Sequence, residues 1–136
     1  MSKYQNLLSP GNTIAFVGAS NHPEKYGHIV FRTMLVHGYR CIPINLKETE
    51  ILGQKVYPTL TEAVKALAPQ AINLVNFIVP PQVTLEVLKE VKALGLKDVW
   101  MQPGSESDEA IAYCEQNGIN CVHNACVMIE SAPDHG

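Results

Sequence analysis

The residues most suited to ligand chemistry lie in a loop near the start of the chain. An apolar run, Thr13–Val17, predicts a buried strand, and Gly18-Ala-Ser20 follows it directly. A glycine after a strand allows the backbone to approach a ligand closely, and the open N–H groups of a following helix bind phosphate. Ser20 adds a hydroxyl donor and Lys25 adds a positive charge. The segment therefore predicts a phosphate-binding turn, and the alternative is an ordinary strand-to-helix turn that requires glycine.

Two common nucleotide-binding patterns are missing from this loop. The dinucleotide fingerprint G-x-G-x-x-G is absent, because the glycine after Gly18 is Gly27. That fingerprint is accompanied by an acidic residue at the end of the second strand, which binds the ribose of NAD. The second strand predicted here ends in Ile44-Asn45, which carries no charge. The triphosphate pattern G-x-x-x-x-G-K-[ST] is also absent, so the sequence disfavours both NAD binding and nucleoside triphosphate hydrolysis.

Catalytic and metal-binding candidates are few. No serine has a nucleophile setting such as G-x-S-x-G, and the carboxylates form no pair suited to acid–base catalysis. His22 and His28 lie near the glycine loop, where a phosphate contact and a packing role are both open. Cys121, His123 and Cys126 are the nearest approach to a metal site, but a fourth ligand is missing. We predict no catalytic residue and no metal, and we interpret these cysteines as buried side chains.

Short apolar runs alternate with amphipathic stretches along the chain. The apolar runs predict five strands, over residues 13–17, 41–44, 71–79, 98–101 and 119–122. The amphipathic stretches predict four helices, over residues 28–37, 61–67, 83–94 and 105–117, with Thr61 and Ser105 as N-caps of the second and fourth. This alternation favours an α/β fold, a doubly wound, mainly parallel sheet with helices on both faces. Ligands bind such sheets beyond the carboxyl ends of the strands, so the loops there should hold the site.

Composition limits the class of partner. The 136 residues are the size of one domain, and we treat residues 1–136 as a single domain. Lys and Arg number 10 against 13 Asp and Glu, and a net charge of −3 argues against a nucleic-acid partner. Residues 66–85 lack charge, but their prolines and amides argue against a membrane span. With no apolar leader and no C-x-x-C pair among four cysteines, we expect a cytoplasmic protein with reduced thiols.

Two further strand-end loops complete the predicted crevice. Phe77-Ile-Val-Pro80 could lay apolar backbone along a ligand, or its proline could simply end the strand. Gln102 and the amides around Gly104 could line the same crevice, and the alternative is again a turn.

Taken in order, these loops resemble the CoA-binding domain family, which includes small stand-alone proteins and the N-terminal domain of the succinyl-CoA synthetase alpha subunit. The matching segments cover roughly residues 12–130, and they are Ile14–Ser20, Pro23, Gly38-Tyr39, Ile42–Asn45, Glu50–Gly53, Val56–Pro58, Phe77–Pro80, Gly95–Lys97, Val99–Gln102, Gly104 and Cys126–Glu130. The family commonly has aspartates in the third strand, where this chain has Asn73 and Asn76. The phosphorylated histidine of the synthetase lies in a further domain, so the resemblance implies no ligase activity.

The resemblance implies a Rossmann-like domain that holds coenzyme A (CoA). The implied phosphate-binding residues lie in the turn that ends at Gly27, and they are Gly18, Ala19, Ser20 and Lys25. The implied adenosine and pantetheine neighbours are Pro43, Ile44, Asn45, Phe77, Ile78, Val79 and Pro80, with Gln102 and Gly104 closing the crevice. We therefore predict a non-catalytic CoA- or acyl-CoA-binding protein. The alternatives are an NAD(P)- or nucleotide-binding regulatory domain and a small enzyme that uses Cys126 or His123 on an acyl-CoA. A protein partner or a homo-oligomer stays open.

Overall fold

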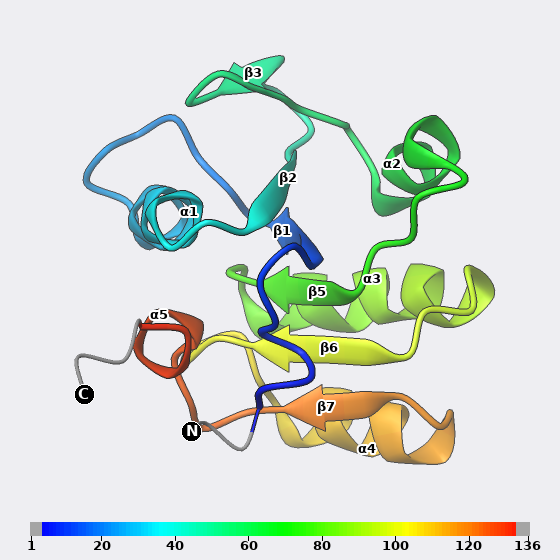
Figure 1. Ribbon diagram of the computed structural model, residues 1–136. Coiled ribbons are helices and arrows are strands. Elements are labelled where there is room, and N and C mark those ends of the chain that lie inside the picture. Colours follow the sequence, from blue (N-terminus) through cyan, green and yellow to red (C-terminus); the bar gives the residue numbers. More distant parts are fainter. Residues whose placement is uncertain (1–3, 133–136) are drawn as a thin grey trace.

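Five short strands form one parallel sheet. The computed structural model describes residues 4–132. The strands are β1 (Thr13–Val17), β2 (Arg40–Ile44), β5 (Leu74–Phe77), β6 (Asp98–Met101) and β7 (Asn120–Val122), in the order β2-β1-β5-β6-β7 (Figure 1). The chain leaves β1 toward β2 on one side and returns to β5 on the other, so the strand order reverses between β1 and β5. The predicted α/β, Rossmann-like fold is confirmed.

Helices cover both faces of the sheet (Figure 1). The helices α1 (Tyr26–Val36) and α5 (Val127–Glu130) pack on one face, and α2 (Leu60–Leu67), α3 (Pro81–Ala93) and α4 (Asp108–Gln116) pack on the other. None of the helices within residues 4–132 has the length and apolar character needed to cross a bilayer.

The alternation of side chains along β1 explains the two layers. Ile14 and Phe16 pack with Phe31 of α1, whereas Ala15 and Val17 belong to the core on the opposite face. Successive residues of a strand point to opposite faces, so a strand buried on both faces must be apolar throughout. Burying each large apolar side chain contributes about 1.5–3 kcal/mol. This packing holds the carboxyl ends of β1 and β5 side by side, where a ligand site is expected.

Most predicted element boundaries shift by one to three residues, and two of these differences bear on the site. The strand expected over residues 71–79 is only Leu74–Phe77. At its start the Asn73 side-chain oxygen accepts a 2.8 Å hydrogen bond from the Thr13 N–H, and beyond its end the Val79 N–H donates to the Ser105 hydroxyl at 3.0 Å. Helix α1 begins at Tyr26, two residues before the predicted start, so its first turn follows the glycine loop directly.

The residues expected to cap two helices have other roles. Thr59 caps α2 and Ser107 caps α4, each accepting a hydrogen bond from a backbone N–H three residues later. Thr61 lies inside α2. The Ser105 hydroxyl accepts a 3.0 Å hydrogen bond from the N–H of Val79, which joins two strand-end loops.

Two small elements were not predicted. One is the hairpin of β3 (Glu50–Ile51) and β4 (Gln54–Lys55), and the other is the four-residue helix α5. Each strand of the hairpin is too short for a periodic pattern. Its turn places Leu52 and Gly53 at φ of 49° and 79°, without the Asn-Gly or Asp-Gly pair that usually indicates such a turn.

Candidate functional site

The floor of the site is backbone from two loops in direct contact. Gly18 has a φ of +105°, a conformation that favours glycine, and a Cβ there would overlap the carbonyl of Ile78 and crowd Val79. A Cβ on Gly27 would overlap the carbonyl oxygen of Gly18. The two glycines therefore seat the β1–α1 turn against both the loop after β5 and the first turn of α1.

A cleft of about 790 Å³ opens above this floor at the carboxyl ends of the strands. Its size is ordinary for a small-molecule or cofactor site. One wall carries polar and cationic groups, Ser20, His22, Lys25, Tyr26 and Lys47. The opposite wall comes from the loops after β5 and β6, and it includes Ile78, Val79, Pro80, Gly104 and Ser105.

A second, apolar compartment of about 700 Å³ adjoins this cleft on the side of α2 and α3. The two compartments share Gly18, Asn45, Lys47, Val79 and Pro80. The lining of the second compartment is mainly aliphatic, with Val17, Ile44, Leu46, Val83 and Val87. The site therefore joins a polar half to an apolar half.

Asn45 stands at the junction of the two halves. Its Nδ2 donates a 2.9 Å hydrogen bond to the carbonyl oxygen of Ala19, in the loop after β1. Its Oδ1 accepts hydrogen bonds from the N–H groups of Lys47 at 2.8 Å and Glu48 at 3.2 Å. One amide thus fixes the loop after β2 and ties it to the glycine loop.

The histidines near the glycine loop have different roles. His28 is buried, and its Nδ1 lies 2.9 Å from the carbonyl oxygen of Ser20, so it supports the turn from below. His22 lines the cleft, and its backbone N–H donates a 3.1 Å hydrogen bond to the Ser20 hydroxyl. A packing role is therefore found for His28, and a place on the cleft wall for His22.

Three hydrogen bonds order the loops after β5 and β6, and two of them join one loop to the other. Gln102 N–H donates to the carbonyl of Phe77 at 3.1 Å, and Ser105 N–H donates to the carbonyl of Gln102 at 2.8 Å. The third is the bond from Val79 N–H to the Ser105 hydroxyl. This network holds Gly104 and Ser105 opposite α1, across the cleft.

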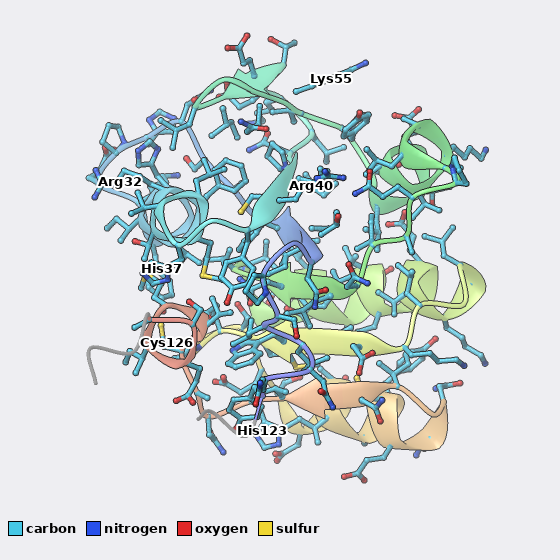
Figure 2. The ribbon with its side chains drawn as sticks, in the orientation of Figure 1. Arg32, His37, Arg40, Lys55, His123 and Cys126 are labelled. Carbon is cyan, nitrogen blue, oxygen red and sulfur yellow. The ribbon has the colours of Figure 1, made fainter. Side chains whose placement is uncertain are left out.

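Behind the cleft wall, Gln102 joins Tyr26 to Cys126. Gln102 is 0% exposed, and its Nε2 lies 2.8 Å from the Tyr26 hydroxyl and 3.3 Å from Cys126 Sγ. Its Oε1 accepts a 2.8 Å hydrogen bond from the N–H of Val127, which fixes the orientation of the amide. The Tyr26 hydroxyl lies 3.5 Å from Cys126 Sγ. Cys126 lies at the start of α5 (Figure 2).

These contacts shift two pKa values. Burial and the contact with Cys126 raise the pKa of Tyr26 to about 12, so its phenol stays protonated near neutrality. Burial is the largest single influence on the Cys126 thiol and raises its pKa. Hydrogen bonds from Tyr26, Gln102 and two N–H groups of α5 together outweigh burial and leave the Cys126 pKa below the ordinary thiol value. The pair therefore combines a phenol whose pKa is raised with a thiol whose pKa is lowered.

The predicted ligand-binding residues fall into two groups. Those that line one of the two compartments are Gly18, Ser20, Lys25, Gly27, Ile44, Asn45, Ile78, Val79, Pro80 and Gly104. Those that are buried behind the lining are Ala19, Pro43, Phe77 and Gln102. Lining residues that the sequence reasoning did not assign include Tyr26, Lys47 and Ser105. Tyr26 directly follows the assigned Lys25, and Lys47 lies two residues after the assigned Asn45. Their closeness in sequence to assigned residues was the available signal.

The cysteine and histidine cluster considered for a metal does not assemble. Within residues 4–132, no three His, Cys, Asp or Glu side chains gather as a metal site requires. Cys121 Sγ contacts the sulfur of Met101 at 3.7 Å. Figure 2 shows Cys126 beside α5, and His123 directly follows the last residue of β7.

An open parallel sheet with helices on both faces and a cleft at the reversal of strand order defines the class of Rossmann-like α/β domains. A family model described as the CoA binding domain matches residues 12–132. The chain belongs to the CoA-binding domain family.

Relatives of known sequence or structure agree with this membership. The chain is 26% identical over 131 residues to the uncharacterized protein YneT of Bacillus subtilis, covering 96% of this chain and 93% of YneT. It is 33% identical over 87 residues to the alpha subunit of an ADP-forming acetate–CoA ligase II of Pyrococcus furiosus, covering 63% of this chain and 18% of that subunit. A solved structure of a conserved hypothetical protein from Pyrococcus furiosus is 38% identical, with a TM-score of 0.81, covering 88% of this chain and 98% of that one.

Proposed function

We propose that the protein binds CoA or an acyl-CoA in the two-compartment cleft. CoA joins a charged pyrophosphate and a 3′-phosphate to an adenine ring and a long pantetheine arm. It therefore needs a cationic region, an apolar region and a channel that continues from them. The polar half adjoining an apolar half, at the point where strand order reverses, is the observation that carries this proposal.

The polar half suits the phosphates. No side chain caps α1 at its N-cap, Lys25, and no acidic residue lies in its first turn. The N–H groups at the start of a helix and the positive end of its dipole favour an anion. Lys25 and Lys47 add positive charge at the rim, and Ser20 adds a hydroxyl. We infer that the pyrophosphate lies against the start of α1.

The apolar half suits the adenine ring. Leu46 is 81% exposed and Val83 is 39% exposed, and both line this compartment. A planar ring laid between them would remove apolar surface from water, at about 25 cal/mol per Å². Pro43, Ile44 and Asn45 would then flank the adenosine from the end of β2, as the family resemblance implies.

With the phosphates at α1 and the adenine in the apolar half, the remaining lining of the cleft is available to the pantetheine arm. From the start of α1, where Lys25 and Tyr26 lie, the lining continues to Gly104 and Ser105 in the loop after β6. Phe77 and Gln102 support that part of the wall from behind. We infer that the pantetheine arm leaves the pyrophosphate along the loops after β5 and β6.

Calorimetric titration with CoA, acetyl-CoA, NAD and ATP tests the proposal. CoA should bind, and CoA at 100 times its Kd should stabilise the protein by about 2.7 kcal/mol. Lys25→Ala and Lys47→Ala should each weaken CoA binding about two- to fivefold, since an exposed ion pair contributes about 0.5–1 kcal/mol. Lys97→Ala, outside both compartments, is the control.

Binding of NAD without binding of CoA would overturn the proposal and favour the alternative of a nucleotide-binding regulatory domain. One observation bears on that alternative. Glu48 lines the cleft three residues after Asn45, although its Oε2 already accepts a 2.7 Å hydrogen bond from the Asn21 side chain.

A further inference from the structure

The apolar compartment contains a single anionic side chain. Of the described residues that line it, Glu90 of α3 alone carries a carboxylate, and most of the others are aliphatic. Val83, Val87 and Glu90 follow one another at helical spacing, so they lie along one face of α3. A rise of about 1.5 Å per residue separates Val83 from Glu90 by about 10 Å along the helix axis. The compartment therefore has an apolar wall with a carboxylate at one end.

The Glu90 carboxylate is held in place through one of its two oxygens. Its Oε1 accepts a 3.1 Å hydrogen bond from the backbone N–H of Thr61 and a 2.7 Å hydrogen bond from the Thr61 hydroxyl. Thr61 lies in the first turn of α2, where the N–H groups and the helix dipole favour an anion. The start of α2 therefore fixes the position of a carboxylate that α3 supplies.

The second oxygen of this carboxylate is accessible. Within residues 4–132 no group donates a hydrogen bond to Glu90 Oε2, and the protein does not enclose that atom. An ionised carboxylate oxygen accepts hydrogen bonds and donates none. The compartment thus offers a hydrogen-bond acceptor, at a fixed place, to a ring that occupies it.

We propose that Glu90 selects adenine as the base of the bound CoA by accepting a hydrogen bond from its 6-amino group. This inference rests on the proposed function, because the adenine ring must first occupy the apolar compartment. A ring laid along Val83 and Val87 would direct one edge toward Glu90, at the end of the same helix face. The 6-amino group of adenine is a donor, whereas guanine and hypoxanthine carry a carbonyl oxygen, an acceptor, at that position.

A fixed acceptor separates these bases by repulsion as well as by attraction. A base with a carbonyl at position 6 would bring its oxygen against Glu90 Oε2 and leave the carboxylate without a donor. A site built around one hydrogen bond rejects a ligand that cannot make it far more strongly than an apolar pocket rejects a ligand of similar shape. The aliphatic lining alone would accept either purine, and Glu90 supplies the distinction.

Calorimetric titration with CoA and with its analogue in which hypoxanthine replaces adenine tests this inference. The analogue exchanges the 6-amino group for a carbonyl and keeps the phosphates and the pantetheine arm. We expect wild-type protein to bind CoA about tenfold or more tightly than the analogue, since a hydrogen bond to a charged group is lost. The same preference should hold for adenosine 3′,5′-bisphosphate over inosine 3′,5′-bisphosphate, which lack the pantetheine arm.

Glu90→Gln changes the accessible oxygen and keeps the contact with α2. The Thr61 N–H can only donate, so the glutamine oxygen should remain beside it and the NH2 group should replace Oε2. Because that NH2 group donates to a carbonyl, the preference for CoA over the analogue should fall below about threefold. Glu86→Gln on the same helix, exposed and outside both compartments, is the matched control and should keep the full preference.

Thr61 is a positioning residue for this selection. Thr61→Val removes the hydroxyl donor and should reduce the preference for CoA, whereas Thr61→Ser keeps the hydroxyl and should retain it. A purely structural role of the contact would lower the unfolding free energy, or the affinity for both ligands alike, and leave their ratio unchanged. An unchanged ratio in folded Thr61→Val protein would contradict the positioning role.

Either of two results would overturn the assignment of Glu90. The first is wild-type protein that binds CoA and the hypoxanthine analogue equally well, a result that requires no variant. The second is Glu90→Gln protein that shows a cooperative urea transition and keeps the full preference for CoA. Wild-type protein that binds neither ligand would instead overturn the proposed function, so the two failures are distinguishable.

Discussion

The side-chain amide of Asn45 donates a 2.9 Å hydrogen bond to the carbonyl oxygen of Ala19, which ties the end of β2 to the glycine loop after β1. Asn45→Ala should weaken CoA binding, because the loop that meets the phosphates loses its tether. Asn45→Asp should weaken it more, since a carboxylate would face both a carbonyl oxygen and the anionic ligand. We expect a loss of about 1–3 kcal/mol in unfolding free energy for the aspartate variant. Urea denaturation measures the unfolding free energy of the two variants, and calorimetry measures their CoA affinity. Equal losses of CoA affinity in the alanine and aspartate variants would show that the charge of the aspartate has no part.

Gly27 lies in the first turn of α1 with no positive φ, so replacement by alanine would ordinarily stabilise the helix by about 0.5–1 kcal/mol. Here the new Cβ would overlap the carbonyl oxygen of Gly18. We expect Gly27→Ala to lower the unfolding free energy by about 1–3 kcal/mol, the usual cost of overpacking. The sign of the change, measured by urea denaturation, decides between close packing and simple helix propensity.

The buried amide of Asn76 predicts that an apolar substitution at this position stabilises the protein. Asn76→Leu should raise the unfolding free energy by about 1–3 kcal/mol, because two unpartnered buried polar atoms are removed. Asn73→Leu is the matched control, since it removes the side-chain oxygen that accepts from Thr13 and should destabilise the protein. A destabilised Asn76→Leu variant would indicate that the amide has a partner in solution.

The lowered pKa of Cys126 predicts an unusual pH dependence of alkylation. Only the thiolate reacts with iodoacetamide, so the rate at Cys126 should reach its half-maximum at a lower pH than in the unfolded chain. Tyr26→Phe removes one donor to the sulfur and should move that midpoint upward. Mass spectrometry of peptides sampled across a pH series measures both midpoints. A midpoint above that of the unfolded chain would contradict the assigned hydrogen bonds.

The sheet and its ligand-side loops could be predicted because their signals are local. Runs such as Thr13–Val17 are apolar at every position and end at a glycine, which indicates a strand buried on both faces. The order of the loops along the chain then determined which residues would gather at one end of the sheet. Ten of the predicted ligand-binding residues line one of the two compartments for this reason.

The contacts among Tyr26, Gln102 and Cys126 could not be predicted, because these residues lie far apart in the sequence. Gln102 meets Tyr26 across 76 positions and Cys126 across 24, and no pattern in the sequence links the three. Gln102 was placed on the crevice wall, but its side chain turns into the core, where the N–H of Val127 holds it. Helix α5, which presents Cys126, has only four residues and no periodic signal of its own.

The contact between Gly18 and the Ile78 carbonyl has a consequence for how such a site can diversify. Where two main chains touch with no room for a Cβ, the surface offered to a ligand is made of peptide groups alone. Side-chain substitution cannot reshape that surface without separating β1 from β5. New ligand preferences must therefore arise at the rim, at positions such as Leu46 and Lys47, while the backbone floor at Gly18 and Ile78 stays unchanged. Substitutions meant to change the ligand should therefore be made at rim positions, and Gly18 should be kept.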